Sequence, residues 1–429
     1  MKKYLLISVF FCALVITRGA LIYSFNNNLS WLSDEERNYE IAKNYLNGKG
    51  FTVYDNDSKT YKLTAYHPSF SVFVYIFMLK NNISKNSWTM FCYSLFIALH
   101  LLSAVYFFKL AQIFIKNKIL TNFATIAYGF YPSVIFYIGS LFLYENMVTP
   151  LLVIVTYKIL RITCFNQDIK IADYFIILLS FMFSALFRPS SITVYVLILA
   201  VSLFFMAKDR LKLKINNTHK IALILSIYLF VFIAHIPILI KNYNMFGHYV
   251  LTTQQNFLFL EGHNPYARGS WAGKPSKSFV TYIHENIPDF ESLNEYQQGA
   301  AYKKLAASWI LNNPVKEMTL LFRKAAIYFL PQNFDSELPG NRLWNPVNLA
   351  AHSLFLLYLC GFLLKKKFPF RIEILLLVPI FASLAFSLAM FVGYRWRYYA
   401  EPFMLLAAFI FLERFIFPGR RPGTIVVKP

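Results

Sequence analysis

The stretch SWTMFCYSLFIALHLLSAVYFF, residues 87–108, decides the fold class of this chain. It contains no Asp, Glu, Lys or Arg, and about 20 mostly apolar residues are enough to cross a bilayer. Comparable stretches recur along the chain and predict an all-α polytopic membrane protein with about ten transmembrane helices, within a range of roughly 9–12. The predicted spans are 4–25, 87–108, 119–138, 141–161, 171–187, 189–206, 220–240, 345–364, 372–392 and 397–417.

The composition favours the same class. Of the 429 residues, 57% are hydrophobic and 15% are charged, whereas about 25% are charged in soluble domains. The net charge of +21 follows largely from basic loops on one side of the membrane, so no nucleic acid is expected as a partner.

The cysteines lie in apolar runs or at their ends, without CxxC or Cys/His spacing: Cys12, Cys92, Cys164 and Cys360. This pattern predicts neither a disulfide scaffold nor a zinc site. No cofactor is identified from the sequence, although a divalent cation that bridges carboxylate and phosphate stays open as an alternative.

The distribution of Lys and Arg predicts the orientation, because short cytoplasmic loops carry the positive charge. With 4–25 as a retained signal-anchor helix, both termini lie in the cytoplasm and the polar segments 26–86 and 241–344 lie outside. We therefore expect an N-terminal catalytic module, 1–240, with its first outer loop at 26–86. A mostly helical extracytoplasmic region, 241–344, and C-terminal helices with a basic tail, 345–429, would follow. The short apolar stretches 68–79 and 318–331 favour interfacial or re-entrant helices.

The first outer loop begins with an acidic helix start, SDEERNYEIAKNYLNGKG, residues 33–50. Ser33 and Glu36 form a capping box, and the first-turn acids Asp34 and Glu35 interact favourably with the helix dipole. The dipole should also lower the pKa of such a carboxyl and keep it ionised. Apolar residues at helical spacing predict a helix on the membrane surface, which the glycines end. The acids are thus either an ordinary helix start or catalytic carboxylates.

Other ionisable residues fall near the predicted outer ends of the spans. A charge at the membrane edge is costly and therefore a functional candidate, and guanidinium groups match phosphate oxygens. The candidates are Glu145, Arg188, Arg395, Arg397, His67, Lys241 and Asn242. The alternatives are pairing of these arginines with Glu145 or Glu401, cation–π packing, an incidental loop histidine and a snorkelling lysine.

Carboxylates and cations on one membrane face suit a reaction of a lipid-linked phosphate substrate. Arginines hold the phosphate, while a carboxylate takes a proton from the attacking hydroxyl. The sequence contains no glycine-rich phosphate loop, so a nucleotide donor is not expected.

The order of these motifs resembles the GT-C glycosyltransferases of the family 39 type, which include protein O-mannosyltransferases and lipid A aminoarabinose transferases. The matching stretches extend from the first span to the last: SDEERNYEIAKNYLNGKGF, TAYHPSFSVFVYIF, SLFLYENMVTPLL, ALFRPSS, PILIKNYNMFGHYVLTTQQNFLFLEGHNPYARGSW and GYRWRYYAEP.

The resemblance implies an inverting enzyme of the cytoplasmic membrane, working on its outer, periplasmic face for the cell envelope. A sugar would move from a polyprenyl-phosphate donor to a lipid, glycan or protein acceptor. Asp34 would be the base, Glu35 its support or an acceptor contact, and Glu145 a second acid. Arg188, Arg395 and Arg397 would face the donor phosphate. Two departures are YHPSF in place of a Lys/Pro-rich segment and a region 241–344 without hallmarks of eukaryotic protein mannosyltransferases.

Three other functions stay open. A transporter or flippase of lipid-linked sugars predicts broken helices at mid-membrane and a repeat between halves. An O-antigen polymerase or ligase also uses polyprenyl donors, but usually lacks an acidic pair after the first span. A non-catalytic subunit of a complex would tolerate loss of Asp34 and Glu145.

Overall fold

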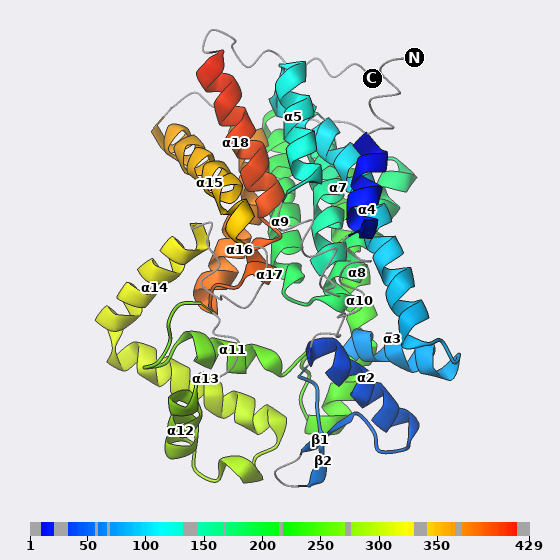
Figure 1. Cartoon of the computed structure of the whole chain (residues 1–429), viewed down its shortest axis with the longest axis vertical. Coiled ribbons are helices and arrows are strands. Elements are labelled where there is room, and N and C mark those ends of the chain that lie inside the picture. Colours follow the sequence, from blue (N-terminus) through cyan, green and yellow to red (C-terminus); the bar gives the residue numbers. More distant parts are fainter. Residues whose placement is uncertain are drawn as a thin grey trace.

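The computed structural model describes residues 10–20, 33–55, 59–66, 69–131, 145–165, 169–213, 218–270, 276–329, 341–364 and 370–417. In these ranges the chain is mostly helical, as predicted. Long helices form a bundle in the upper part of Figure 1, and shorter helices with one small hairpin lie below it.

A helix lies within each predicted span. The bundle contains residues 10–20, α4 (Lys85–Phe114), α5 (Lys118–Gly129), α7 (Glu145–Cys164), α8 (Ile171–Phe187), α9 (Ser191–Leu213), α10 (Thr218–Phe246), α15 (Asn341–Leu364), α16 (Phe370–Ala389) and α18 (Glu401–Ile416). Three described stretches are long and apolar enough to cross a membrane, in α4, α7 and α10. They mark the chain as a membrane protein, while the number of about ten spans stays a prediction.

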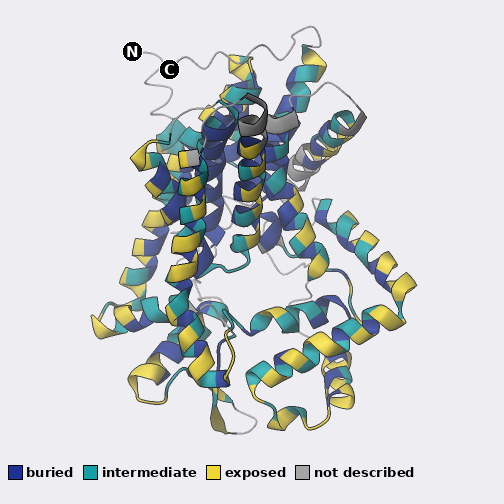
Figure 2. Cartoon of the chain, turned by 180° about the vertical axis from the view of Figure 1, so that it is seen from behind, coloured by how far each residue is buried: buried dark blue, intermediate teal, exposed yellow. Residues whose placement is uncertain are grey.

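Helix α7 lies at the centre of the bundle. Its most apolar window is 78% buried, against 39% for α4 and 28% for α10. Helix α10 instead exposes large apolar side chains, such as Leu229 and Phe232. Exposed apolar residues on the outer surface and a packed interior suit a protein whose solvent is lipid (Figure 2).

We keep the names first outer loop for residues 26–86 and second outer region for residues 241–344, after the side of the membrane that was predicted for them, which stays a prediction. The first outer loop contains α2 (Ser33–Leu46), the strands β1 (Thr52–Asp55) and β2 (Thr60–Leu63), and α3 (Ser69–Lys80). Gly48 and Gly50, which follow α2, have φ angles of +76° and +72°, so the predicted glycine stop is present. The strands pair antiparallel, with Tyr54 opposite Tyr61. This hairpin was not predicted from the sequence.

The second outer region contains α11 (Gln254–Gly262), α12 (Lys277–Asn286), the 3₁₀ turn η1 (Phe290–Ser292), α13 (Glu295–Asn312) and α14 (Pro314–Phe329). Its own small core includes Leu260, Phe279, Ile283 and Ala306. The predicted helical character of this region is therefore confirmed, as are the helices expected within 68–79 and 318–331.

The two outer regions are joined near Ala65. Its amide donates to Glu295 Oε1 at 2.9 Å, and its carbonyl accepts from the Thr253 amide at 3.1 Å. Thr252 Oγ1 also donates to the Tyr66 carbonyl. These bonds satisfy backbone groups that no sheet or helix satisfies, so the first outer loop is fixed to the base of α11.

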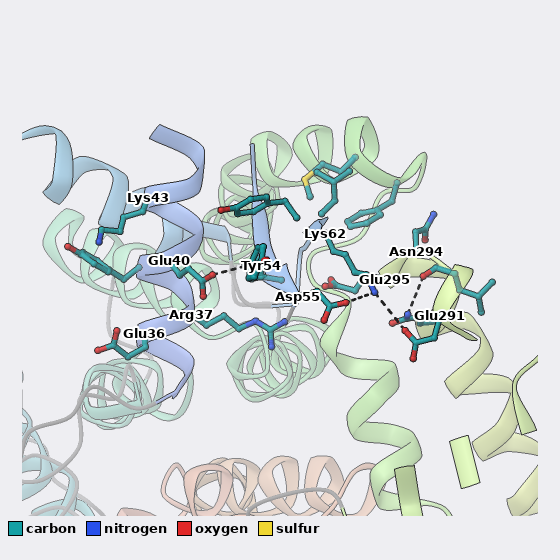
Figure 3. Close-up of a pocket in the computed structure, with 18 of the residues that line it drawn as sticks. Glu36, Arg37, Glu40, Lys43, Tyr54, Asp55, Lys62, Glu291, Asn294 and Glu295 are labelled. Atoms are coloured by element: carbon teal, nitrogen blue, oxygen red, sulfur yellow. Dashed lines mark hydrogen bonds and ion pairs between the residues drawn. The ribbon is translucent and has the colours of Figure 1, made fainter. Parts of the chain in front are cut away.

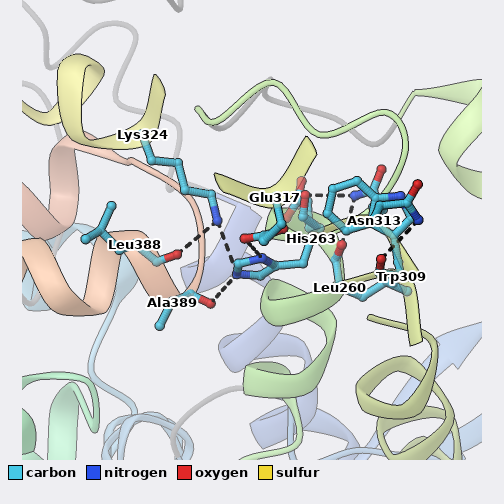
Figure 4. Close-up of polar contacts among 10 residues, drawn as sticks. Leu260, His263, Trp309, Asn313, Glu317, Lys324, Leu388 and Ala389 are labelled. Carbon is cyan, nitrogen blue, oxygen red and sulfur yellow. Dashed lines mark hydrogen bonds and ion pairs between the residues drawn. The ribbon is translucent and has the colours of Figure 1, made fainter. Parts of the chain in front are cut away.

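A buried polar cluster joins the second outer region to the end of α16 (Figure 4). His263 Nδ1 lies 2.8 Å from Glu317 Oε1, and His263 Nε2 lies 3.2 Å from Lys324 Nζ. Lys324 also donates to the Leu388 carbonyl at 3.0 Å. Burial lowers the pKa of Lys324 to about 8, although Glu317 acts in the opposite direction. We call these three side chains the α16 cluster.

Gly262 lets α11 approach α16 closely. A Cβ at this position would lie 1.8 Å from the Met390 carbonyl oxygen, a backbone atom that cannot rotate away. Beyond it, Val392 donates to the Gly269 carbonyl at 2.9 Å. The close contact between α11 and α16 therefore requires a residue without a side chain at position 262.

We predict that Gly262→Ala separates α11 from α16. The free energy of unfolding should fall by about 1–3 kcal/mol, the usual cost of overpacking. Hydrogen exchange of peptides covering 254–270 and 388–397 should speed up. Gly361→Ala is the control, because its Cβ would meet nothing within 4 Å. Equal exchange in the two variants would contradict the prediction.

Candidate active site

The predicted catalytic acids lie in the first turn of α2. Glu35 is 1% exposed and Asp34 is partly buried, whereas Glu36 points outward and pairs with Lys85 at 3.0 Å. Successive first-turn acids thus have different surroundings. The Glu35 side chain points into the protein, and the Glu36 side chain lies on the exposed side of α2.

Tyr66 lies beside the start of α2. Its hydroxyl is within electrostatic range of Asp34, Arg37 and Glu261, and the Arg37 guanidinium lies 5.2 Å from the centre of the Tyr66 ring. Burial raises the pKa of Tyr66 to about 12. The structure therefore brings α2 and α11 together around one tyrosine.

Glu145 and Arg188 form a buried ion pair at the head of the central helix. Arg188 Nη2 lies 3.1 Å from Glu145 Oε1, and Glu145 is 1% exposed. Glu145 is the first residue of α7, and Arg188 directly follows α8. The pairing proposed from the sequence as an alternative to phosphate binding is thus present. The Arg188 side chain also interacts with the buried hydroxyl of Tyr399, so the guanidinium is held from two sides.

The acidic helix and the ion pair lie at the same end of the bundle. Ile41 and Ala42 of α2 share a buried apolar cluster with Met147, two residues after Glu145. Phe187, which precedes Arg188, packs against the same cluster. Hydrophobic packing therefore positions α2 beside the heads of α7 and α8.

The second arginine motif lies in α17 (Tyr394–Arg397). Arg397 Nε donates to Glu401 Oε1 at 3.0 Å, and both side chains are buried. This pair is again the alternative that the sequence left open. Arg395 lies in the same short helix, and its side chain is outside what the structure describes.

The remaining candidates lie elsewhere. Lys241 Nζ is 4.4 Å from the centre of the Phe51 ring, and Asn242 Nδ2 donates to the Val250 carbonyl at 2.7 Å. Both contacts connect α10 to outer loops. His67 lies outside the described residues. Within the described ranges, no group of three or more His, Cys, Asp or Glu side chains could hold a metal ion.

A cavity of about 1460 Å³ lies on the outer side of α2 (Figure 3). Its walls are α2, the hairpin, the end of α10 and the start of α13. Glu36, Arg37, Glu40 and Lys43 line it from α2, whereas Asp34, Glu35 and Glu145 do not. It is therefore adjacent to the candidate site and separate from it.

Glu261 is a candidate that was missed from the sequence. It lies in α11 beside Tyr66, and burial raises its pKa to about 7. A carboxyl with this proton affinity is suited to acid–base work near neutral pH. The stretch FLFLEGHNPYARGSW contains it, but its burial comes from docking of α11 and leaves no mark in the sequence.

We predict strong coupling between Glu145 and Arg188. Glu145→Gln or Arg188→Met leaves a buried charge without its partner. The losses of unfolding free energy in the two single variants should therefore add up to more than the loss in the double variant. The coupling energy should be about 1–3 kcal/mol, measured by a double-mutant cycle of unfolding. The exposed pair Glu36–Lys85 is the control, with an expected coupling below about 1 kcal/mol. Similar coupling in both pairs would contradict the assignment.

We also predict a pH dependence from Glu261. Its pKa is raised from 4.5 to about 7, so between these values the folded chain binds more protons than the unfolded chain and stability falls as pH rises. Glu261→Gln removes this loss, roughly 3 kcal/mol by pH 8. Unfolding of wild type and variant at pH 4 and pH 8 measures it, with the exposed Glu285→Gln as control. A constant difference between wild type and Glu261→Gln would refute it.

Comparisons with known proteins give one structural likeness. No protein-family model matches the chain, and no curated protein matches it. Among solved structures, it is similar to an archaeal oligosaccharyltransferase, AglB from Archaeoglobus fulgidus, which was solved with an inhibitory peptide and a dolichol-phosphate. The two are 13% identical with a TM-score of 0.48, and the match covers 95% of this chain and 50% of that one. The chain thus spans about half the length of AglB.

Proposed function

We propose that the chain is an inverting glycosyltransferase of the GT-C type, resembling family 39 and its mannosyltransferases. It moves a sugar from a polyprenyl-phosphate donor to an acceptor hydroxyl on the outer face of the cytoplasmic membrane. Both termini lie in the cytoplasm in this proposal, and the outer regions 26–86 and 241–344 face the outside.

One observation carries the proposal. Helix α2, whose first turn carries the acids, shares a buried apolar cluster through Ile41 and Ala42 with the heads of α7 and α8, which carry the Glu145–Arg188 pair. Carboxylates that accept protons and guanidinium groups that bind phosphate are the two chemistries that this reaction needs. The order of motifs along the sequence gives independent support.

In the proposed reaction, the acceptor oxygen attacks the anomeric carbon from the side opposite the phosphate. Asp34 takes the proton of the hydroxyl as the carbon–oxygen bond forms. The bond between the sugar and the phosphate breaks, and its electron pair goes to the phosphate oxygen. A single displacement of this kind inverts the anomeric centre.

The other candidates have supporting roles. Arg188 faces the donor phosphate while Glu145 holds its Nη2, so the guanidinium is oriented before the donor binds. Arg397 is held in the same way by Glu401. Arg395 is proposed from the sequence alone to face the donor phosphate. Glu35 supports Asp34 or contacts the acceptor. A weaker role, contact with the substrate at the edge of the site, is proposed for Lys241, Asn242 and His67.

We predict that Asp34→Asn lowers transfer by about 10²–10⁴-fold, the usual contribution of a general base. The measurement is mass spectrometry of lipids and surface glycans in a deletion strain that carries each variant. Glu285→Gln, which changes an exposed carboxylate in α12 outside the cavity, should restore the product as wild type does. Full restoration by Asp34→Asn would exclude it as the base.

A further inference from the structure

The cavity on the outer side of α2 has the size and composition of a binding site for a polymer. Its volume of about 1460 Å³ exceeds the roughly 300–1,000 Å³ of most small-molecule sites. Met245 and Phe246 at the end of α10 line it, as do residues of the hairpin and of η1.

The charges of the cavity nearly balance, and several are paired with one another. Asp55 lies 2.7 Å from Lys62, and Glu36 lies 3.0 Å from Lys85. The lining carboxylates are Glu36, Glu40, Asp55, Glu291 and Glu295, and the lining cations are Arg37, Lys43, Lys62 and Lys85. Such a wall has no strong field of either sign, so it favours an uncharged ligand over a polyanion or a polycation.

The hairpin offers aromatic surface at the rim. Tyr54 and Tyr61 are 42% and 43% exposed, and their rings lie edge to face with centres 5.1 Å apart. Tyrosine combines an apolar face with a hydroxyl, which suits a molecule that has C–H faces and many hydroxyl groups. Asn294 and Gln298 add amide donors and acceptors on the opposite wall.

The strand edge that faces the cavity is already occupied. The Tyr54 amide donates to Glu40 Oε1 at 3.3 Å, so this position cannot donate to an added strand. A site that binds an extended peptide as an added strand needs free backbone amides along the strand edge. Addition of a peptide strand at this position of β1 is therefore disfavoured.

One residue that lines the cavity also contacts the surroundings of the candidate base. Arg37 lines it and also lies over the Tyr66 ring, whose hydroxyl is in range of Asp34. Arg37 follows Asp34 by three residues, a rise of about 4.5 Å along the helix. A chain held in the cavity would thus have one end close to Asp34.

We propose that this cavity binds the growing end of an uncharged oligosaccharide, which is the acceptor of the transfer. The name acceptor rests on the proposed function, whereas saccharide binding in the cavity does not. The sugar rings stack on Tyr54 and on the face of Tyr61 opposite Lys49, whose Nζ lies 4.0 Å from the centre of the Tyr61 ring. The polar walls bind the hydroxyl groups of the sugars.

The test measures binding without donor. The full chain in lipid nanodiscs is titrated with fluorescently labelled hexasaccharides of glucose, mannose and N-acetylglucosamine, and with a Ser/Thr-rich dodecapeptide. At least one saccharide should bind, and Tyr54→Ala combined with Tyr61→Ala should weaken it about tenfold. The matching double Phe variant keeps the rings and should bind nearly as wild type. Tyr249→Ala removes an exposed tyrosine that stacks on Tyr243 outside the cavity and should change nothing.

The proposal is overturned if no saccharide binds, if the double Ala variant binds as wild type, or if only the peptide binds and loses affinity in that variant. Failure of the proposed function gives a different result. In that case saccharides still bind through the tyrosines, but wild type transfers no sugar in the deletion strain.

Discussion

A bilayer provides no partner for a charge or an open hydrogen bond, and this constraint organises the whole molecule. Ionisable side chains must therefore lie at the ends of the helices or be paired inside the bundle. Arg18 shows the second solution, because it is 0% exposed and donates to the Gly129 carbonyl at the end of α5. The Glu145–Arg188 and Arg397–Glu401 pairs follow the same rule. Each pair also orients a guanidinium group that a lone, solvated arginine would leave mobile.

The sequence predicted the helices well, since an uninterrupted apolar stretch of membrane length allows few structures besides a helix. The helix after Ser33 and its end at Gly48 followed from local capping and glycine chemistry. The hairpin was not predicted, because strands of four residues such as TVYD and TYKL carry too little alternation to identify. The number of spans depends on depth in the membrane, which the chain alone does not specify.

The candidate site was predicted by residue type more successfully than by arrangement. Pairing of Arg188 with Glu145 was one of two alternatives, since charge spacing does not say which ions meet. Glu261 and the α16 cluster were missed because their properties arise from contacts distant in sequence. His263 and Lys324, for example, are 61 residues apart, and Lys324 is 64 residues from its acceptor, Leu388. A lysine in α14 reads as a surface residue until the docking of the helix is known.

The second outer region is attached at two separate places, near Ala65 on one side and at α16 on the other. A region attached at one place could rotate away from the bundle. The second outer region is attached at two places, so it can rotate only if one of these attachments is released. Releasing the attachment at α16 would break the hydrogen bonds from Lys324 to the Leu388 carbonyl and from His263 to the Ala389 carbonyl. A hydrogen bond to a charged group alone contributes about 1.5–3 kcal/mol. For the lipid-linked donor of the proposed function, the route of entry is therefore sideways between helices of the bundle, with the second outer region staying in place.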